Sequence, residues 1–449
     1  MAVSAPALRE ALVDIVGREH VLADGRQLEA AAVDGVVPRW VVRAHTENDV
    51  SRLLALASAE SLAVAPRGSG SSQGLGNPPR RLDLVLDLSR LDAVTEYVAE
   101  DMVASVEAGM TLGALGGRLS PARQRLALDP YGGEGRTIGG VLACNASGPL
   151  RFRYGAGRDL LLGVRFVQAD GTITWGGAKV VKSVTGYDVP KLMVGSLGTL
   201  GVLAEVTLRL HPIPPAWGAR LWTFDTVAAA AAHVAAILDS TLQPERVVLL
   251  GAGALNAMRD ALPDSPADLP PDGAAVAVSV ASTTEAVRAQ MALLERLAAE
   301  PGGRGSELTG GFWSRLGGAL ASPVALKIAG EPARLGHWLR QLEHVARDGD
   351  VRLIAVGEAG SGVLRAALRA PGGDGLPSGT WLAGAVAGLR AALAPEGGSL
   401  VVERAPRAVK ETLDVWGPVA PEVLDVMRRL KHEFDPAGIL NPGRFAGGL

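Results

Sequence analysis

The sequence has one cysteine, Cys144, among its 449 residues. A single cysteine cannot form an internal disulfide, and it cannot supply the thiolates of an iron–sulfur cluster or of a cysteine-based zinc site. We therefore expect any iron–sulfur cluster that works with this chain to belong to a partner. A lone cysteine is usually a small buried apolar residue, so Cys144 by itself predicts no reactive site.

The net charge is small, and the sequence has no long apolar run. The formal net charge is -3 at pH 7, which gives no reason to expect nucleic acid or an anionic membrane as a partner. The longest apolar run, 227–238, is rich in alanine, contains His233 and is too short to cross a bilayer. Residues 1–10 show no basic stretch followed by an apolar one, so we expect no signal peptide. These features predict a cytoplasmic protein without a transmembrane segment.

Glycine, in contrast, is abundant, with 57 residues, many of them between positions 68 and 201. The first cluster, Pro66 to Gly74, follows the apolar stretch 62–65 and has glycines and serines whose N–H groups can turn toward one anion. In a Rossmann unit such a loop opens a helix. Here Pro78 and Pro79 follow shortly after it and rule a helix out. The loop therefore predicts a phosphate-bearing cofactor in a different architecture.

Three more glycine clusters follow in order along the chain, at 137–148, 154–159 and 195–203. Small residues in such runs allow a large ligand to lie against the backbone. A tight helix–strand junction is the alternative explanation for any one cluster taken alone. Four clusters in this order and spacing favour a cofactor site.

Together the clusters resemble the FAD-binding domain of the vanillyl-alcohol oxidase / p-cresol methylhydroxylase (PCMH-type) superfamily. Its pattern reads approximately P-x-G-x-G-[TS], then T-I-G-G…N-A-S-G, then Y-G…D-G, then G-S-x-G-T-L-G-[IV]. Residues 434–443 match the closing signature F-D-P-x-x-x-L-N-P-G. Within the superfamily, segments 147–151, 176–182 and 186–196 look most similar to the FAD-binding E subunits of bacterial glycolate oxidases.

The resemblance implies an α+β fold in three parts. A two-lobed PCMH-type FAD-binding domain would cover 1–215, ending at the proline-rich segment 212–215. An α+β cap domain with an antiparallel sheet and helices would cover 216–405, where strand and helix patterns alternate. The C-terminal segment 406–449 would return to the flavin.

The resemblance also implies the residues that contact FAD. The loop at 66–72 would hold the pyrophosphate through its N–H groups, Gly201 and Val202 would touch the adenine end, and Asn441 would lie near the isoalloxazine ring. The complete set of implied cofactor residues is Pro66, Arg67, Gly68, Ser69, Gly70, Ser71, Ser72, Thr137, Gly139, Gly140, Asn145, Ser147, Gly148, Gly201, Val202 and Asn441.

Ser71 predicts that the FAD is held non-covalently. Several relatives carry at this position a histidine that bonds to the flavin, and a serine cannot make that bond. Attachment through another histidine is the alternative, but none lies in a recognisable attachment motif. The seven histidines are His20, His45, His211, His233, His337, His344 and His432.

The catalytic residues depart from the family pattern. Hydroxy-acid dehydrogenases of this superfamily carry H-x-H-x-G-D-G-N and a later E-H-G, which supply metal ligands and a general base. The counterparts here, 355–365 and 402–405, lack every histidine, so we expect no metal site. The base and the carboxylate-binding cation that hydroxy-acid oxidation needs have only weak candidates, each more often a structural or solvated charge. These are Glu358, Glu403, Arg404 and Lys182.

These observations predict the FAD-binding subunit of a glycolate oxidase (glycolate dehydrogenase) complex that oxidises the 2-hydroxy acid glycolate to glyoxylate. Its partners would be a catalytic flavin subunit and an iron–sulfur subunit, which would place it at the inner face of the membrane. One alternative is a free-standing FAD-dependent 2-hydroxy-acid dehydrogenase acting on CH-OH donors. The second is a scaffold protein without flavin.

Overall fold

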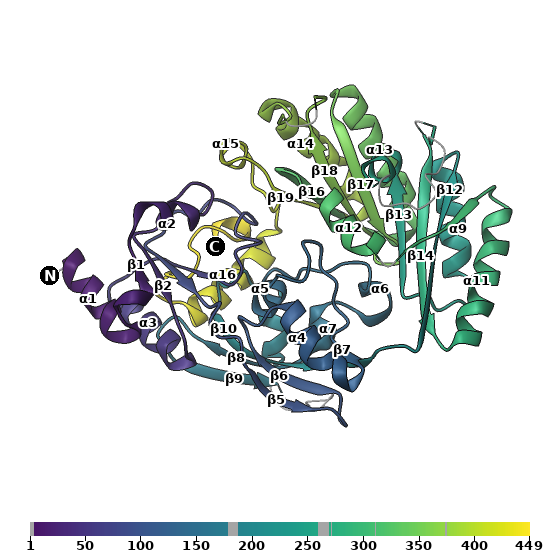
Figure 1. Ribbon diagram of the computed structural model, residues 1–449. Helices are drawn as coiled ribbons and strands as arrows, with labels where there is room; N and C mark the ends of the chain where they lie inside the picture. Colours follow the sequence, from purple (N-terminus) through teal and green to yellow (C-terminus); the bar gives the residue numbers. More distant parts are fainter. Residues whose placement is uncertain (1–3, 178–186, 259–268, 271, 310, 373–374) are drawn as a thin grey trace.

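The computed structural model describes residues 4–177, 187–258, 269–270, 272–309, 311–372 and 375–449. Two lobes of mixed helices and strands lie on one side of the molecule, and a large sheet covered by helices lies on the other (Figure 1). The C-terminal segment returns from the large sheet to the two lobes (Figure 1). The predicted α+β fold with an antiparallel sheet is confirmed.

The first lobe is built on a sheet with the strand order β1-β2-β4-β3. Both β2 and β3 pair in parallel with β4, which buries the apolar residues of this short central strand. The helix α3 begins at a capping box in which Thr46 and Asp49 exchange hydrogen bonds of 3.1 and 3.0 Å. The elements are α1 (Ala5–Val16), β1 (Val21–Leu22), α2 (Gly25–Ala30), β2 (Trp40–Arg43), α3 (Glu47–Ala59), β3 (Val64–Arg67) and β4 (Leu84–Asp87).

The second lobe is an antiparallel sheet with the order β5-β6-β10-β8-β9. Strands β8 and β9 form a hairpin. The elements are β5 (Val94–Val98), β6 (Val103–Glu107), α4 (Leu112–Leu119), β7 (Gln124–Arg125), α5 (Ile138–Ala143), α6 (Arg151–Tyr154), α7 (Gly157–Leu160), β8 (Leu161–Val167), β9 (Ile173–Gly177), α8 (Val189–Met193), β10 (Val202–Arg209) and β11 (His211–Pro212).

The cap is an antiparallel sheet with the order β15-β12-β14-β13-β17-β18-β16-β19. Its strands are β12 (Ala216–Phe224), β13 (Arg246–Gly251), β14 (Ala274–Ser282), β15 (Arg304–Glu307), β16 (Val324–Ala329), β17 (Arg352–Glu358), β18 (Val363–Arg369) and β19 (Ser399–Arg404). Its helices are α9 (Val227–Leu238), α10 (Ala252–Ala257), α11 (Thr284–Ala299), α12 (Gly311–Ala319), α13 (Leu335–Asp348) and α14 (Gly379–Leu393).

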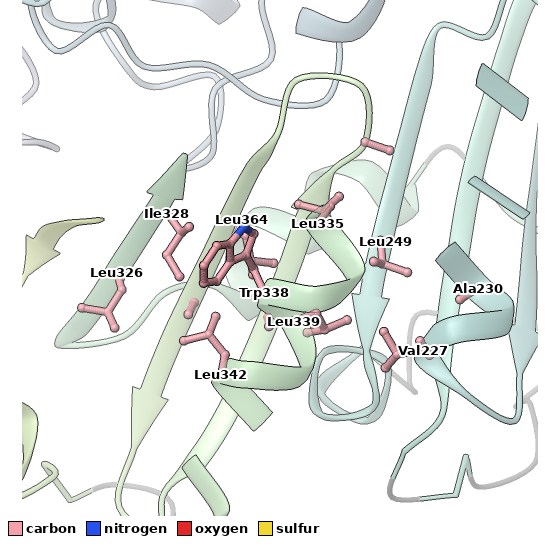
Figure 2. Packing of buried hydrophobic residues seen from close by; sticks show 14 of the residues in the cluster. Val227, Ala230, Leu249, Leu326, Ile328, Leu335, Trp338, Leu339, Leu342 and Leu364 are labelled. Atoms are coloured by element: carbon pink, nitrogen blue, oxygen red, sulfur yellow. The ribbon is translucent and has the colours of Figure 1, made fainter. Parts of the chain in front are cut away.

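Helix α13 anchors the core of the cap. Trp338, Leu339 and Leu342 point from one side of this helix toward Leu364 and Leu326 of the sheet (Figure 2). Burying each of these side chains contributes about 1.5–3 kcal/mol of transfer free energy. On the opposite face of the sheet, residues of α10 and α12 form a second buried cluster with strand residues such as Ile354 and Ala367.

The C-terminal segment, with α15 (Arg407–Lys410) and α16 (Pro421–Phe434), rejoins the first lobe. Leu440 forms a parallel bridge to Val64, and its side chain is fully buried in the core of that lobe. Lys431 donates to the carbonyls of Thr199 and Leu440, both at 2.8 Å. These contacts tie the last residues of the chain to both lobes.

A buried histidine makes the stability of the cap dependent on pH. His233 on α9 is fully buried against Trp222 and Phe224, and this burial lowers its pKa to about 4. The unfolded chain, with a histidine pKa of about 6.5, then binds more protons than the folded chain. The free energy of unfolding should therefore fall as the pH drops from about 6.5 to about 4, by up to about 3 kcal/mol from this group.

Urea denaturation at several pH values tests this contribution. The His233→Leu variant should lose it, so its unfolding free energy should change less than that of the unmodified chain between these pH values. Carboxylates titrate equally in both proteins and cancel in the comparison. Parallel pH profiles would show that His233 does not carry the effect.

No helix in the described part of the chain is long and apolar enough to cross a membrane.

Candidate functional site

The first glycine cluster forms a loop directly after β3, as the sequence predicts. Its N–H groups from Gly68 to Ser72 donate no hydrogen bond to any described residue. Consecutive backbone N–H groups without partners are rare in proteins and are typical of anion-binding loops. The loop thus has the chemistry needed to hold a pyrophosphate.

Side chains of the C-terminal segment hold this loop in place by hydrogen bonds to its carbonyls. The guanidinium of Arg444, which is 2% exposed, donates to the carbonyl of Leu75 at 2.7 Å, to the carbonyl of Gln73, and to the side-chain oxygen of Asn441 at 3.2 Å. The ammonium of Lys410 donates to the carbonyl of Gly74 at 2.6 Å and forms an ion pair with Asp34. Two buried cations therefore fix the backbone of residues 73–76.

The second cluster forms the opposite wall, where α5 packs against the end of β6. Gly139 donates to the carbonyl of Ala108 at 2.8 Å, and a Cβ at Gly139 would lie 2.7 Å from that of Ala108. A Cβ at Gly68 would lie 2.1 Å from the hydroxyl oxygen of Thr137. These glycines let the two walls approach each other closely.

The fourth cluster and the C-terminal signature complete the enclosure. The side chain of Asn441 donates to the carbonyl of Leu197 at 2.7 Å, and both residues have positive φ, at 46° and 53°. The backbone N–H of Asn441 donates to Val64 at 2.9 Å. Asn441 therefore joins the last glycine cluster to the strand that leads into the first.

The walls line a cavity that is open to solvent and has an empty volume of about 710 Å³, which we call the cradle. Among the cofactor residues implied by the sequence, Asn145 and Ser147 line a neighbouring cavity instead, and Gly148 lies outside both, packed against Asp129. The cradle brings together Pro66, Arg67, Gly68, Ser69, Gly70, Ser71, Ser72, Thr137, Gly139, Gly140, Gly201, Val202 and Asn441. Cys144, Leu203 and Arg444 also line it, and the motifs did not identify them.

Ser71 lines the cradle, and none of the seven histidines lines either cavity. We therefore expect all of the FAD to be released when the purified protein is precipitated with acid. The measurement is flavin absorbance in the supernatant and in the washed pellet. Yellow colour that stays with the denatured chain would contradict this expectation and point to a covalent bond.

The neighbouring cavity lies between the second lobe and the cap, and we call it the cap-side cavity. It has an empty volume of about 1020 Å³ and shares Ser71, Ser72 and Cys144 with the cradle. Its charged lining residues are Arg136, Arg365, Glu403 and Arg404. A ligand in this cavity would therefore lie next to a cofactor in the cradle.

The structure brings two of the four catalytic candidates, Glu358 and Glu403, together around Arg365. The guanidinium of Arg365 bonds to Glu358 at 3.1 Å and to both oxygens of Glu403 at 2.8 Å. The side chain of Arg404 lines the cavity and forms no ion pair or hydrogen bond with the described residues. The fourth candidate, Lys182, lies outside the described residues.

A β-bulge explains how Glu403 and Arg404 face the same cavity although they are neighbours in one strand. Arg404 pairs with Ala325 and Val402 pairs with Leu326, so Glu403 is the extra residue of β19. Alternate residues of a regular strand point to opposite faces, and a bulge changes this direction. Val402 remains in the core, whereas the next two side chains line the cavity.

Arg365 remains charged because its carboxylate partners outweigh the effect of burial. Burial alone lowers the pKa of its guanidinium, but Glu403 and Glu358 raise it above its usual value. Burial likewise raises the pKa of Glu403, but Arg365 and Lys327 overcome this and lower it. Both glutamates are thus engaged by one internal cation.

The metal site of the hydroxy-acid dehydrogenases that the sequence resembles does not fit these residues. No group of three or more His, Cys, Asp or Glu side chains in the described ranges is placed to hold a metal ion. The two carboxylates that converge here already share the guanidinium of Arg365. A divalent ion would have to displace this buried side chain.

Two parts of the chain match known families. Residues 38–177 match the family described as "FAD binding domain", and residues 214–368 and 418–445 match "FAD linked oxidases, C-terminal domain". The second match joins the cap to the C-terminal segment. The glycine-lined cradle lies mainly in the first.

Two curated relatives and one solved structure illustrate the similarity. Glycolate oxidase subunit GlcD of Bacillus subtilis is 26% identical over 424 residues, which cover 91% of this chain and 89% of that protein. Glycolate oxidase subunit GlcE of Escherichia coli is 36% identical over 151 residues, which cover 33% of this chain and only 43% of that protein. A crystal structure of p-cresol methylhydroxylase with substrate bound has a TM-score of 0.75 and 16% identity, covering 97% of this chain and 96% of that one.

Proposed function

Since this chain is an FAD-linked oxidoreductase with the PCMH-type fold, we propose that it is the FAD-binding subunit of a glycolate oxidase-type complex. Subunits named for glycolate oxidase are among its relatives, and the match to GlcE is confined to a third of this chain. In this proposal a partner flavin subunit oxidises the 2-hydroxy acid glycolate to glyoxylate. The flavin of this chain passes the electrons to an iron–sulfur partner.

The cradle is the observation that carries the proposal. The free N–H groups from Gly68 to Ser72 would bind the FAD pyrophosphate, and Arg444 and Lys410 would hold their loop in place. Thr137 and Gly139 would line the opposite wall, Gly201 the adenine end, and Asn441 the isoalloxazine side. When bound, FAD supplies an acceptor for two electrons.

We propose boundaries for three parts of the chain, according to what each part contributes to the FAD site. Residues 1–215 would form the FAD-binding domain and residues 216–405 the cap. The segment 406–449 would complete the FAD site, since it contributes Lys410, Asn441 and Arg444.

The residues of the cap-side cavity favour a role in electron transfer, in which this chain does not itself oxidise the hydroxy acid. Removal of hydride from a hydroxy acid needs a base for the hydroxyl proton. The carboxylates closest to the cavity, Glu358 and Glu403, are both bound to Arg365, and no histidine lines the cavity. The base would then belong to the partner flavin subunit.

Co-purification tests the proposed role. A tagged chain expressed with its natural neighbours should retain a flavin protein and an iron–sulfur protein. Glycolate should bleach the flavin of this complex under anaerobic conditions, while the isolated holoprotein should stay oxidised. If the tagged chain retains neither a flavin protein nor an iron–sulfur protein, the subunit proposal is contradicted.

A free-standing FAD-dependent dehydrogenase acting on the CH-OH group of a 2-hydroxy acid is the second candidate. The excess of arginine in the cap-side cavity favours it, because a hydroxy-acid substrate carries a carboxylate. In that case glycolate or lactate should bleach the flavin of the isolated holoprotein. A chain that purifies without flavin and binds none when FAD is added would support the scaffold alternative.

A further inference from the structure

Charged side chains at the start of β13 join the cap to the second lobe. The carboxylate of Glu245, which is 1% exposed, accepts hydrogen bonds from the guanidinium of Arg125 and from the hydroxyl of Tyr154, the latter at 3.1 Å. The neighbouring Arg246 donates to Glu245 and to Asp129, in both cases at 2.9 Å. We call these five residues the seam. Breaking a buried ion pair by removing one partner is costly, so the seam holds the cap in one position on the second lobe.

Asp129 is the member of the seam that also holds the second glycine cluster. One of its carboxylate oxygens accepts from Arg246, and the other accepts from the backbone N–H of Leu150 at 2.9 Å. Its carbonyl oxygen lies so close to Gly148 that a Cβ there would be only 1.9 Å away. Asp129 therefore contacts the cap on one side and residues 148–150 on the other.

This contact explains why the cluster has a glycine at position 148, although Gly148 lines neither cavity. Any larger residue would have to displace the backbone of Asp129. Just before Gly148, the hydroxyl of Ser147 and the side-chain oxygen of Asn145 are buried and form no hydrogen bond with the described residues. Both of these residues line the cap-side cavity, which adjoins the cradle. A shift of Gly148 would therefore move two polar groups that lie next to the cofactor site.

We propose that Asp129 is a positioning residue, which couples the position of the cap to the cofactor site. Arg246 holds Asp129 from the cap, and Asp129 in turn sets the position of the segment 145–150 beside the cradle. The inference rests on the proposed function in one respect, that FAD lies in the cradle. It goes beyond that function because it gives the contact between the cap and the second lobe an effect on the flavin.

The ion pair between Asp129 and Arg246 is the link that substitutions can break. Arg246 bonds to Glu245 and to Ser279 of the cap, and its shortest connection to the segment 145–150 runs through Asp129. Two residues that act through one shared contact have effects that do not add in the double variant. Burial raises the pKa of Asp129 to about 6, although Arg246 opposes this shift. Measurements at about pH 8 therefore keep the carboxylate charged and the pair complete.

Hydrogen exchange of the flavin-free chain, followed by mass spectrometry, tests the coupling without the cofactor. Arg246→Gln should raise the exchange rate of the segment 145–150 about tenfold, because this segment loses the support of Asp129. Asp129→Asn should raise it to a similar extent, and the double variant should raise it no further. The matched control is Asp225→Asn, which breaks an exposed ion pair with Arg304 elsewhere on the cap and should leave this segment unchanged.

The flavin spectrum of the FAD-loaded protein tests whether the coupling reaches the cofactor. Asp129→Asn and Arg246→Gln should shift the visible spectrum in the same way and weaken FAD binding about threefold to tenfold. Gly148→Ala should cause a similar shift, since its Cβ would displace the carbonyl of Asp129. A purely structural role would lower the melting temperature of these variants and leave the spectrum of the bound flavin unchanged.

Three results would overturn the proposal. One is an unchanged exchange rate of the segment 145–150 in Arg246→Gln, and another is a double variant in which the effects of the two single changes add. The third is a bound flavin whose spectrum is the same in the unmodified protein and in all three variants. Each of these can occur in a chain that binds one FAD, so the proposed function would stand. A chain that binds no FAD would contradict the proposed function, and hydrogen exchange would still decide whether Asp129 couples the cap to the segment.

Discussion

The Gly68→Val variant should lose FAD, with binding weakened at least about a hundredfold, equivalent to about 2.8 kcal/mol. Even the first carbon of a side chain at Gly68 would lie 2.1 Å from the hydroxyl oxygen and 2.9 Å from the Cβ of Thr137. Thr137 is buried and branched at Cβ, so it cannot move aside easily. The loop must shift instead, and its N–H groups then lose their common direction. Fluorescence titration of the flavin-free protein with FAD measures the effect.

Gly116→Ala is the matched control for this change. Gly116 lies on the exposed face of α4, and a Cβ there would meet nothing within 4 Å. Alanine in a helix is more stable than glycine by about 0.5–1 kcal/mol, so this variant should be slightly stabilised and should bind FAD normally. Normal FAD binding by Gly68→Val would show that this loop does not hold the cofactor.

The Arg444→Met variant should lose both stability and FAD affinity. Arg444 is buried and donates to the carbonyls of Gln73 and Leu75 and to the side-chain oxygens of Gln73 and Asn441. Each acceptor that stays buried without a donor costs about 1–3 kcal/mol, so we expect the unfolding free energy to fall by about 3–5 kcal/mol. Because the loop then loses its support, FAD should also bind at least about tenfold more weakly.

Urea denaturation of the flavin-free protein separates the two effects, since it measures stability without the cofactor. The control is Arg429→Met on α16, where the side chain is 73% exposed and pairs with the exposed Asp425. That variant should change the unfolding free energy by less than about 0.5 kcal/mol. Equal stability of both variants would mean that Arg444 does not support the loop.

The sequence predicts the cofactor site well because glycine marks backbone geometry locally. Thirteen of the implied residues line one cavity, and the loop at 66–74 forms without a following helix. The capping box of Thr46 and Asp49 and the hairpin of β8 and β9 are local features of the same kind. Each of these signals depends on residues that lie close together in the chain.

The remaining features depend on contacts between distant residues, so the sequence could not reveal them. Lys410 and Arg444 donate hydrogen bonds to carbonyls of the loop, from positions more than 330 residues further along the chain. Arg365 lies at the end of the segment that lacks the expected histidines, yet only the sheet register shows that it joins Glu358 to Glu403. The bulge that aims Glu403 and Arg404 into one cavity has no sequence signal of its own.

The motif comparison could, however, have suggested Arg365. It is the last residue of 355–365, the counterpart of the metal-binding motif, and it is a charged residue in that segment. Tyr131 and Arg136 gave no such hint, because they lie between two glycine clusters and matter only through the folded shape of the cavity.

The flavin content of the purified chain tests the central claim most directly. Acid release and absorbance should give one FAD for each chain, or the flavin-free protein should take up one FAD when it is added. A chain that contains no flavin and binds none, although it is folded, would contradict the account of the cradle.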